Sequence, residues 1–223
     1  MISRRRFLRA APAAAVAIAH AVRAGAAPSS IEMICRRAWS AVKPTGEFER
    51  HRIKRMTVHH SAVLLTDNSD APAHLRSHQA SHQGRGWPDI AYHLIVDRGG
   101  NVYEGRPMWA TPDTATNYDP TGHFTVMCEG NFEEQRPSRA QIDALAGVLA
   151  WASERFDIAP RTISGHQEYA DTACPGDKLQ SIIAGGVVRQ KVKERLAAGG
   201  VELVEVCGTE GKRRVQAIEA GSA

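Results

Sequence analysis

The chain has 223 residues, of which 43% are hydrophobic and 23% charged. This is typical of one globular domain with its own core and unlike a wholly disordered chain. The formal charge of +4 resides at the N-terminus: residues 1–27 contain five arginines and no acidic residue, and without them 23 basic side chains stand against 24 acidic ones. A strongly basic domain is therefore excluded, and we expect no nucleic acid partner.

The first segment resembles a twin-arginine export signal. Ser3-Arg4-Arg5 precedes Phe7-Leu8, an alanine-rich apolar run spans residues 10–22, and Ala24-Gly25-Ala26 follows. A charged start, an apolar run and a small-x-small cleavage pattern in this order are typical of a cleaved signal, and the run is too short for a stable membrane anchor. We expect residues 1–27 to direct export to the periplasm or the cell exterior. The alternative is a basic amphipathic start to a cytoplasmic protein.

Strand and helix signals alternate in the first half of the remaining chain. In chain order, the patterns predict an irregular segment at 31–55, a strand at 56–61, a helix at 72–83, a strand at 90–96, a turn at 97–101 into a strand at 102–104, a polar surface loop at 107–122 and a strand at 124–128.

The second half is mainly helical. Ser138 and Gln141 form a capping-box pair at the start of a helix that Pro160 ends. A short strand at 162–164 and two helices, at about 178–183 and 187–197, follow. Because hairpin and crossover connections both occur, we expect a single α/β domain over residues 28–198 with a central mixed sheet flanked by helices. Residues 199–223 are expected to form a mobile tail.

Histidine and cysteine residues follow two of the predicted strands. His59 and His60 end the strand at 56–61, and Cys174 comes eight residues after His166. Imidazole and thiolate are the ligands that Zn²⁺ prefers, and three protein ligands plus water make a catalytic site. Neighbouring strand residues point to opposite faces, so His59 and His60 do not easily share one metal. Each of these side chains, taken singly, also fits an ordinary core or surface role.

The other cysteines leave the disulfide pattern open. No Cys-x-x-Cys pair occurs, which excludes a thioredoxin motif or a zinc ribbon. Cys128 lies in an apolar run and is expected to be buried. An oxidising compartment permits disulfides, but the spacing does not show whether Cys35, Cys128 or Cys207 form one.

From about residue 34 to residue 179 the chain resembles the type-2 N-acetylmuramoyl-L-alanine amidases and peptidoglycan-recognition proteins. The resemblance rests on blocks in a fixed order, among them Arg37-Ala38-Trp39-Ser40-Ala41, Val58-His59-His60-Ser61-Ala62, Gly86-Trp87-Pro88-Asp89-Ile90-Ala91-Tyr92-His93, Gly99-Gly100-Asn101-Val102-Tyr103-Glu104, Glu129-Gly130-Asn131-Phe132, Gly165-His166 and Ala173-Cys174-Pro175-Gly176.

The resemblance implies that His59, His166 and Cys174 bind Zn²⁺ and that Tyr92 and Thr172 assist catalysis. The implied reaction is hydrolysis of the amide between N-acetylmuramic acid and L-alanine, with peptidoglycan or a muropeptide as substrate and the protein acting as a monomer. The alternatives are a non-catalytic peptidoglycan-binding protein, a type that usually lacks the cysteine ligand, and a hydrolase acting on a different amide.

One loop departs from the family pattern. Members often carry Gly-Ala-His before the strand at 124–128, where this chain has Thr111-Pro112-Asp113 and, further on, His123. Substrate contacts from this loop are therefore not implied by the resemblance.

Several further polar or aromatic residues allow two interpretations. His60 is expected to support the ligand site or to lie in the core. Glu168 could be a general base, but a role in the turn is favoured. Trp87 and Trp109 could each be a platform for a sugar; packing is favoured for Trp87, and the role of Trp109 is left open. Three histidines recur every fourth residue in the predicted helix at 72–83, namely His74, His78 and His82. They could form a second metal-binding stripe, but a polar face toward a groove or solvent is favoured.

Overall fold

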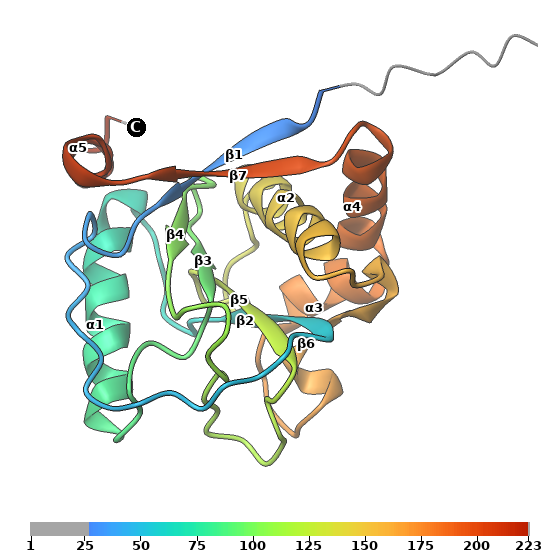
Figure 1. Ribbon diagram of the computed structural model, residues 1–223, viewed down its shortest axis with the longest axis horizontal. Helices are drawn as coiled ribbons and strands as arrows, with labels where there is room; N and C mark the ends of the chain where they lie inside the picture. Colours follow the sequence, from blue (N-terminus) through green and yellow to red (C-terminus); the bar gives the residue numbers. More distant parts are fainter. Residues whose placement is uncertain (1–26, 223) are drawn as a thin grey trace, which may run out of the picture.

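The structure, a computed structural model, describes residues 27–222 and is built on a seven-stranded sheet (Figure 1). The predicted signal at residues 1–27 lies almost wholly outside the described residues. The strand order is β6-β2-β5-β3-β4-β1-β7, and all neighbouring strands pair in parallel except β3 and β4. The strands are β1 (Ser29–Ile34), β2 (Arg55–His60), β3 (Leu94–Val96), β4 (Val102–Glu104), β5 (His123–Cys128), β6 (Ile163–Gly165) and β7 (Val201–Val206).

Within the described residues, five α-helices cover the two faces of this sheet. They are α1 (Ala71–Gly84), α2 (Arg139–Arg155), α3 (Asp177–Ala184), α4 (Val187–Ala197) and α5 (Gly208–Glu219). Helices α2, α3 and α4 lie on one side of the sheet, and α1 lies on the other (Figure 1). The predicted fold class, a single α/β domain with a mixed sheet flanked by helices, is confirmed.

The two faces of the sheet carry two apolar clusters, because successive residues of a strand point to opposite faces. In β5, Val126 and Cys128 pack in the cluster that contains the apolar face of α2, whereas Met127 packs in the cluster that contains Leu75 of α1. The C-terminal ends of β2, β5 and β6 lie at the same sheet edge because these strands are parallel. Residues that follow these strands are thereby brought together.

Helix α2 begins as its sequence predicts, but only half of the capping box forms. The Ser138 hydroxyl accepts the backbone N–H of Gln141 at 3.0 Å. The buried Gln141 side chain does not return to the cap; it donates to the carbonyls of Val96 and Glu129. Helix α2 thus fixes the ends of β3 and β5.

The predicted strand at 90–96 is shorter in the structure, since β3 begins only at Leu94. The preceding backbone groups find partners outside a strand ladder. The N–H of Ala91 donates to the His82 ring, and the carbonyl of Tyr92 accepts the N–H of Arg106. The segment before β3 is thus held by α1 and by the residues that follow β4.

Residues 201–219 belong to the fold and do not form the expected tail. Strand β7 pairs with all six residues of β1. The last four residues of β1 lie in the segment at 31–55 for which the sequence predicted irregular structure. Helix α5 buries Val215 and Ile218 in the cluster that also contains Leu75 of α1. Strands β1 and β7 lie near opposite ends of the described chain and stabilise each other by pairing. No local sequence pattern indicates such a contact.

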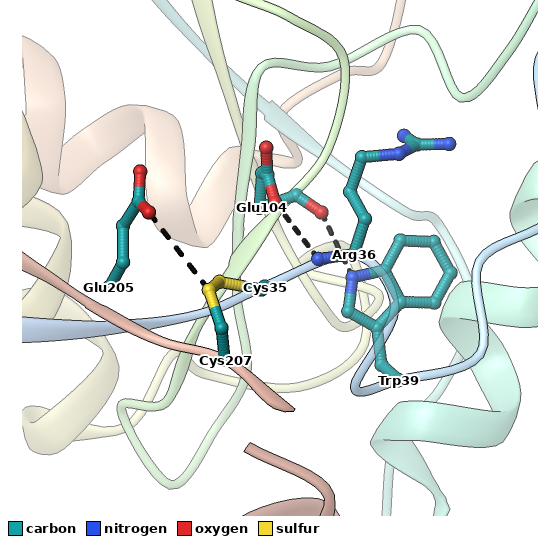
Figure 2. Close-up of a disulfide and its surroundings, with 6 residues drawn as sticks. All are labelled: Cys35, Arg36, Trp39, Glu104, Glu205 and Cys207. Atoms are coloured by element: carbon teal, nitrogen blue, oxygen red, sulfur yellow. Dashed lines mark hydrogen bonds between the residues drawn. A yellow bond between two sulfur atoms is a disulfide. The ribbon is translucent and has the colours of Figure 1, made fainter. Parts of the chain in front are cut away.

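A disulfide joins the ends of these two strands (Figure 2). The buried Cys35 follows β1, and the exposed Cys207 follows β7. Beside it the turn after β1 is held on β4, since the Arg36 N–H and the Trp39 indole N–H each donate to Glu104 at 2.9 Å. Among the described cysteines, Cys128 and Cys174 are free.

We predict that Cys207→Ser lowers the free energy of unfolding by about 2–5 kcal/mol, the range typical of a lost native disulfide. The cysteines are 172 residues apart, so the bond restricts a large loop in the unfolded chain. Urea denaturation without reductant measures the change. Wild-type protein in reductant should unfold like the variant, and a variant as stable as the oxidised wild type would contradict the prediction.

No helix within residues 27–222 combines the length and the apolar character that crossing a membrane requires.

Candidate functional site

Sheet register places two of the predicted ligands side by side. In the parallel pairing of β2 with β6, Val58 lies opposite Gly165, so the next residues are His59 and His166. Their ring centroids are 4.6 Å apart. The loop before α3 brings in Cys174, whose Sγ is 3.6 Å from His59 Nδ1 and accepts the backbone N–H of His60 at 3.4 Å. The donor atoms of the three side chains all lie within 4.8 Å of one another.

The chemistry of this cluster fits a zinc ion. Within the described residues, His59 Nε2 and His166 Nδ1 are buried without a hydrogen-bond partner. Burial lowers the pKa of His59 well below its usual value and that of His166 to about 4, so both rings are neutral, the form that binds metal. Burial raises the pKa of Cys174 to about 12, against a smaller opposing effect of the His60 N–H. A bound cation is what would favour its thiolate. Two imidazoles and one thiolate are ligands that Zn²⁺ accepts, with a fourth position open.

A cavity of about 340 Å³ adjoins the cluster, and both predicted catalytic residues line it. The ring of Tyr92 lies 5.1 Å from that of His59. Burial raises the pKa of Tyr92 well above its usual value, so the phenol stays protonated and can donate a hydrogen bond. Thr172 Oγ1 accepts the backbone N–H of Cys174 at 3.2 Å. Its own hydroxyl proton is not used in that contact.

The backbone around Tyr92 is held by the residues that follow β4. A Cβ atom on Gly105 would overlap the Tyr92 carbonyl, so glycine is required for this close approach. The buried Arg106 side chain donates to the Ile90 carbonyl at 3.0 Å and pairs with Asp113 at 2.5 Å. Arg106 thereby connects the Tyr92 segment to the loop at 107–122.

This loop supplies a contact that the sequence analysis missed. Thr116 Oγ1 lies 2.7 Å from His166 Nε2, and Thr114 Oγ1 lies 2.8 Å from Thr116 Oγ1. Nothing in the local sequence marks either threonine, because the loop is polar throughout. In the region that departs from the pattern of the family that the sequence resembles, Asp113 lines the cavity. His123 does not line it, since its ring is hydrogen-bonded to Thr57 at 2.7 Å.

Of the remaining candidates, His60 and Trp87 line the cavity, whereas Glu168 and Trp109 do not. His60 Nδ1 accepts the N–H of Phe132 at 3.4 Å, on the face of β2 opposite His59. Glu168 Oε1 accepts the N–H of Gly165 at 2.9 Å, which is the turn role. The ring of Trp87 packs against that of His82 in the wall of the cavity. Trp109 is 41% exposed and is not among the cavity residues.

The three regularly spaced histidines of α1 serve two different places. The ring of His82 lines the cavity, 4.9 Å from the ring of Trp87 and 5.8 Å from that of Tyr92. His74 and His78 turn to the buried carboxylate of Glu129. The three histidines therefore form neither a single metal-binding stripe nor a single polar face.

Known proteins match the part of the chain that contains this site. A family model for N-acetylmuramoyl-L-alanine amidase, Amidase_2, matches residues 49–177, which include all five predicted site residues. An N-acetylmuramoyl-L-alanine amidase of Sus scrofa is 32% identical over 132 residues, 56% of this chain and 22% of that protein. The crystal structure of Drosophila peptidoglycan recognition protein SD has a TM-score of 0.63 and 25% identity over 69% of this chain and 93% of that one.

A structure of peptidoglycan recognition protein-LE is similar to the same degree. It contains tracheal cytotoxin, a monomeric diaminopimelic acid-type peptidoglycan, and matches with a TM-score of 0.63 and 25% identity over 69% of this chain and 92% of that one.

Proposed function

The chain belongs to the N-acetylmuramoyl-L-alanine amidase (Amidase_2) family, and from this premise we propose that it is a zinc-dependent enzyme. The proposed reaction hydrolyses the amide between N-acetylmuramic acid and L-alanine of peptidoglycan. The observation that carries the proposal is the buried His59, His166 and Cys174 cluster beside a cavity that Tyr92 lines. A protein that only binds peptidoglycan has no need of a cysteine in that place.

Zinc bound by these three residues would polarise the substrate carbonyl and lower the pKa of a bound water. The surrounding side chains have separate tasks. The Tyr92 phenol, protonated at neutral pH, donates a hydrogen bond to the amide oxygen as negative charge develops there. The Thr172 hydroxyl lies at the Cys174 turn and donates to the oxygen or orients the attacking water. Thr116 holds His166 in its rotamer and tautomer.

Peptidoglycan or a soluble muropeptide is the proposed substrate. A structural relative binds a monomeric peptidoglycan fragment, and another relative is named as the amidase. The cavity is about 340 Å³, at the lower end of the range of small-molecule sites, so it would hold only the part of the substrate around the scissile amide.

Purified peptidoglycan tests the proposal directly. We expect the protein to release stem peptides with a free alanine amino group, which mass spectrometry detects. A chelator should stop the release, and added zinc should restore it. Binding of peptidoglycan with no peptide released would support the non-catalytic alternative and contradict the enzyme.

The contact between Thr116 and His166 gives a further prediction. With the ring proton on Nε2 directed at Thr116 Oγ1, the Nδ1 atom is left free to bind metal. Thr116→Val keeps the shape and removes the acceptor. We expect zinc affinity at this site to fall by about 10- to 100-fold, as for other residues that orient a ligand.

Competition with a chromophoric chelator measures that affinity. The matched control is Thr121→Val, an exposed position of the same loop, which should leave it unchanged. Equal affinities for both variants would show that Thr116 does not orient His166.

We also propose export through the twin-arginine route to the periplasm or the cell exterior, where the cell wall lies. The Cys35–Cys207 disulfide supports this, because such bonds persist in oxidising compartments. Replacing Arg4 and Arg5 by lysine keeps the charge of the N-terminal segment but should strand the precursor in the cytoplasm. Cell fractionation measures the distribution, and export of the variant at the wild-type level would contradict the route.

A further inference from the structure

A second cluster of metal-binding side chains lies between α1 and the end of β5. His74 Nδ1 is 3.0 Å from Glu129 Oε1, and His78 Nε2 is 3.0 Å from Glu129 Oε2. One donor atom from each of the three residues lies within 4.8 Å of the others. The histidines are one helical turn apart on α1, so both rings reach the same point.

The Glu129 carboxylate is a buried charge that lacks a permanent cationic partner. Its side chain is 0% exposed, and its only ion-pair partners among the described residues are these two histidines. A buried carboxylate is costly without a cation beside it, and at this cluster a protonated histidine or a metal ion supplies that charge.

We propose that His74, His78 and Glu129 bind a second divalent metal ion, Zn²⁺, distinct from the ion held by Cys174. Two ligand atoms at about 2.0–2.1 Å from one tetrahedral zinc ion are roughly 3.3 Å apart, close to the 3.0 Å between Glu129 and each histidine. Two histidines four residues apart on a helix, joined by a carboxylate from another element, are a known zinc donor set.

The surroundings of this cluster suit an ion that enters from solvent. The side chains of His74 and His78 are 24% and 14% exposed, which leaves room for water to complete the coordination. Ser61 Oγ donates to Glu129 Oε1 at 3.0 Å, a contact that orients the carboxylate. Gln141 of α2 holds the Glu129 backbone from the other side.

The position of the cluster indicates a supporting role. In the register of β2 with β5, His60 lies opposite Cys128, so Ser61 and Glu129 follow directly. An ion there would tie α1 to the ends of both strands. The next turn of α1 carries His82, which lines the catalytic cavity. The second ion would therefore stabilise the wall of the cavity without touching the reacting atoms.

Zinc stoichiometry of the full chain tests the proposal. The variants are Cys174→Ser, which removes a ligand of the first site, and His78→Gln, which removes a ligand of the second but keeps an N–H donor for Glu129. We expect two zinc ions for the wild type, one for each single variant and none for the double variant, by elemental analysis after dialysis. His82→Gln, one turn further along α1, is the matched control and should keep both ions.

Two further measurements separate the sites from each other and from misfolding. Cobalt in His78→Gln should show a thiolate-to-metal charge-transfer band, whereas cobalt in Cys174→Ser should bind without one. Added zinc should raise the melting temperature of Cys174→Ser but not of the double variant, with both metal-free forms melting alike.

One zinc ion in the wild type, lost in Cys174→Ser and kept in His78→Gln, would overturn the second site and leave the first. One ion lost in His78→Gln and kept in Cys174→Ser would instead overturn the first site and with it the proposed function.

Discussion

Replacement of Cys174 by serine is expected to remove the zinc ion held with His59 and His166 and to lower amidase activity by more than about 1000-fold. Loss of a single stabilising donor in a hydrolase site typically costs 100- to 1000-fold, and here the ion that would polarise the carbonyl leaves altogether. A serine hydroxyl does not ionise near neutral pH, so it cannot replace the thiolate that Zn²⁺ requires.

Peptide release from peptidoglycan and zinc content are to be measured on the same preparation. Cys128→Ala is the control for loss of a free cysteine. Cys128 lies in the core cluster on the α2 face and takes no part in the site, so this variant should keep zinc and activity while losing some stability. Full activity of Cys174→Ser would disprove the ligand assignment.

Replacement of Tyr92 by phenylalanine is expected to reduce turnover by about 100- to 1000-fold while zinc content and fold are kept. Only the hydroxyl is lost, from a residue that lines the cavity and whose ring lies 5.1 Å from that of His59. The hydrogen bond it donates strengthens as charge develops on the amide oxygen, so kcat should fall far more than KM rises.

Tyr103→Phe is the matched control, because the Tyr103 hydroxyl donates to Asp97 at 2.7 Å and Tyr103 is not among the residues lining the cavity. It should lose stability and keep turnover. If Tyr92→Phe turns over peptidoglycan like the wild type, Tyr92 serves only to pack the cavity wall.

The protonation states of the cluster also bear on how the chain folds without zinc. The two buried histidines are neutral and the thiol is protonated without metal, so no buried charge is left unpaired when the ion is removed. The chain can therefore fold before loading, and the site can be restored by added zinc.

The sequence by itself was enough for features that depend on neighbouring residues. The hairpin around 97–101, the Ser138 cap and the helix that follows it are determined by local hydrogen bonds and by the period of apolar residues. The blocks around His59 and His166 pointed to the family model that matches residues 49–177. The fold class followed from the alternation of strand and helix.

The tertiary structure alone decided which distant residues meet. Strand β7 joins β1 with Ser29 opposite Val201, and the pairing turned an expected tail into part of the sheet and placed Cys35 beside Cys207. Thr116 reaches His166 from a loop with no motif, and Glu129 meets two histidines that the sequence showed only as a regular spacing. Such contacts are set by strand register and by helix packing over long chain separations. A local pattern contains neither, because it records the period of an element and not the partner it will face.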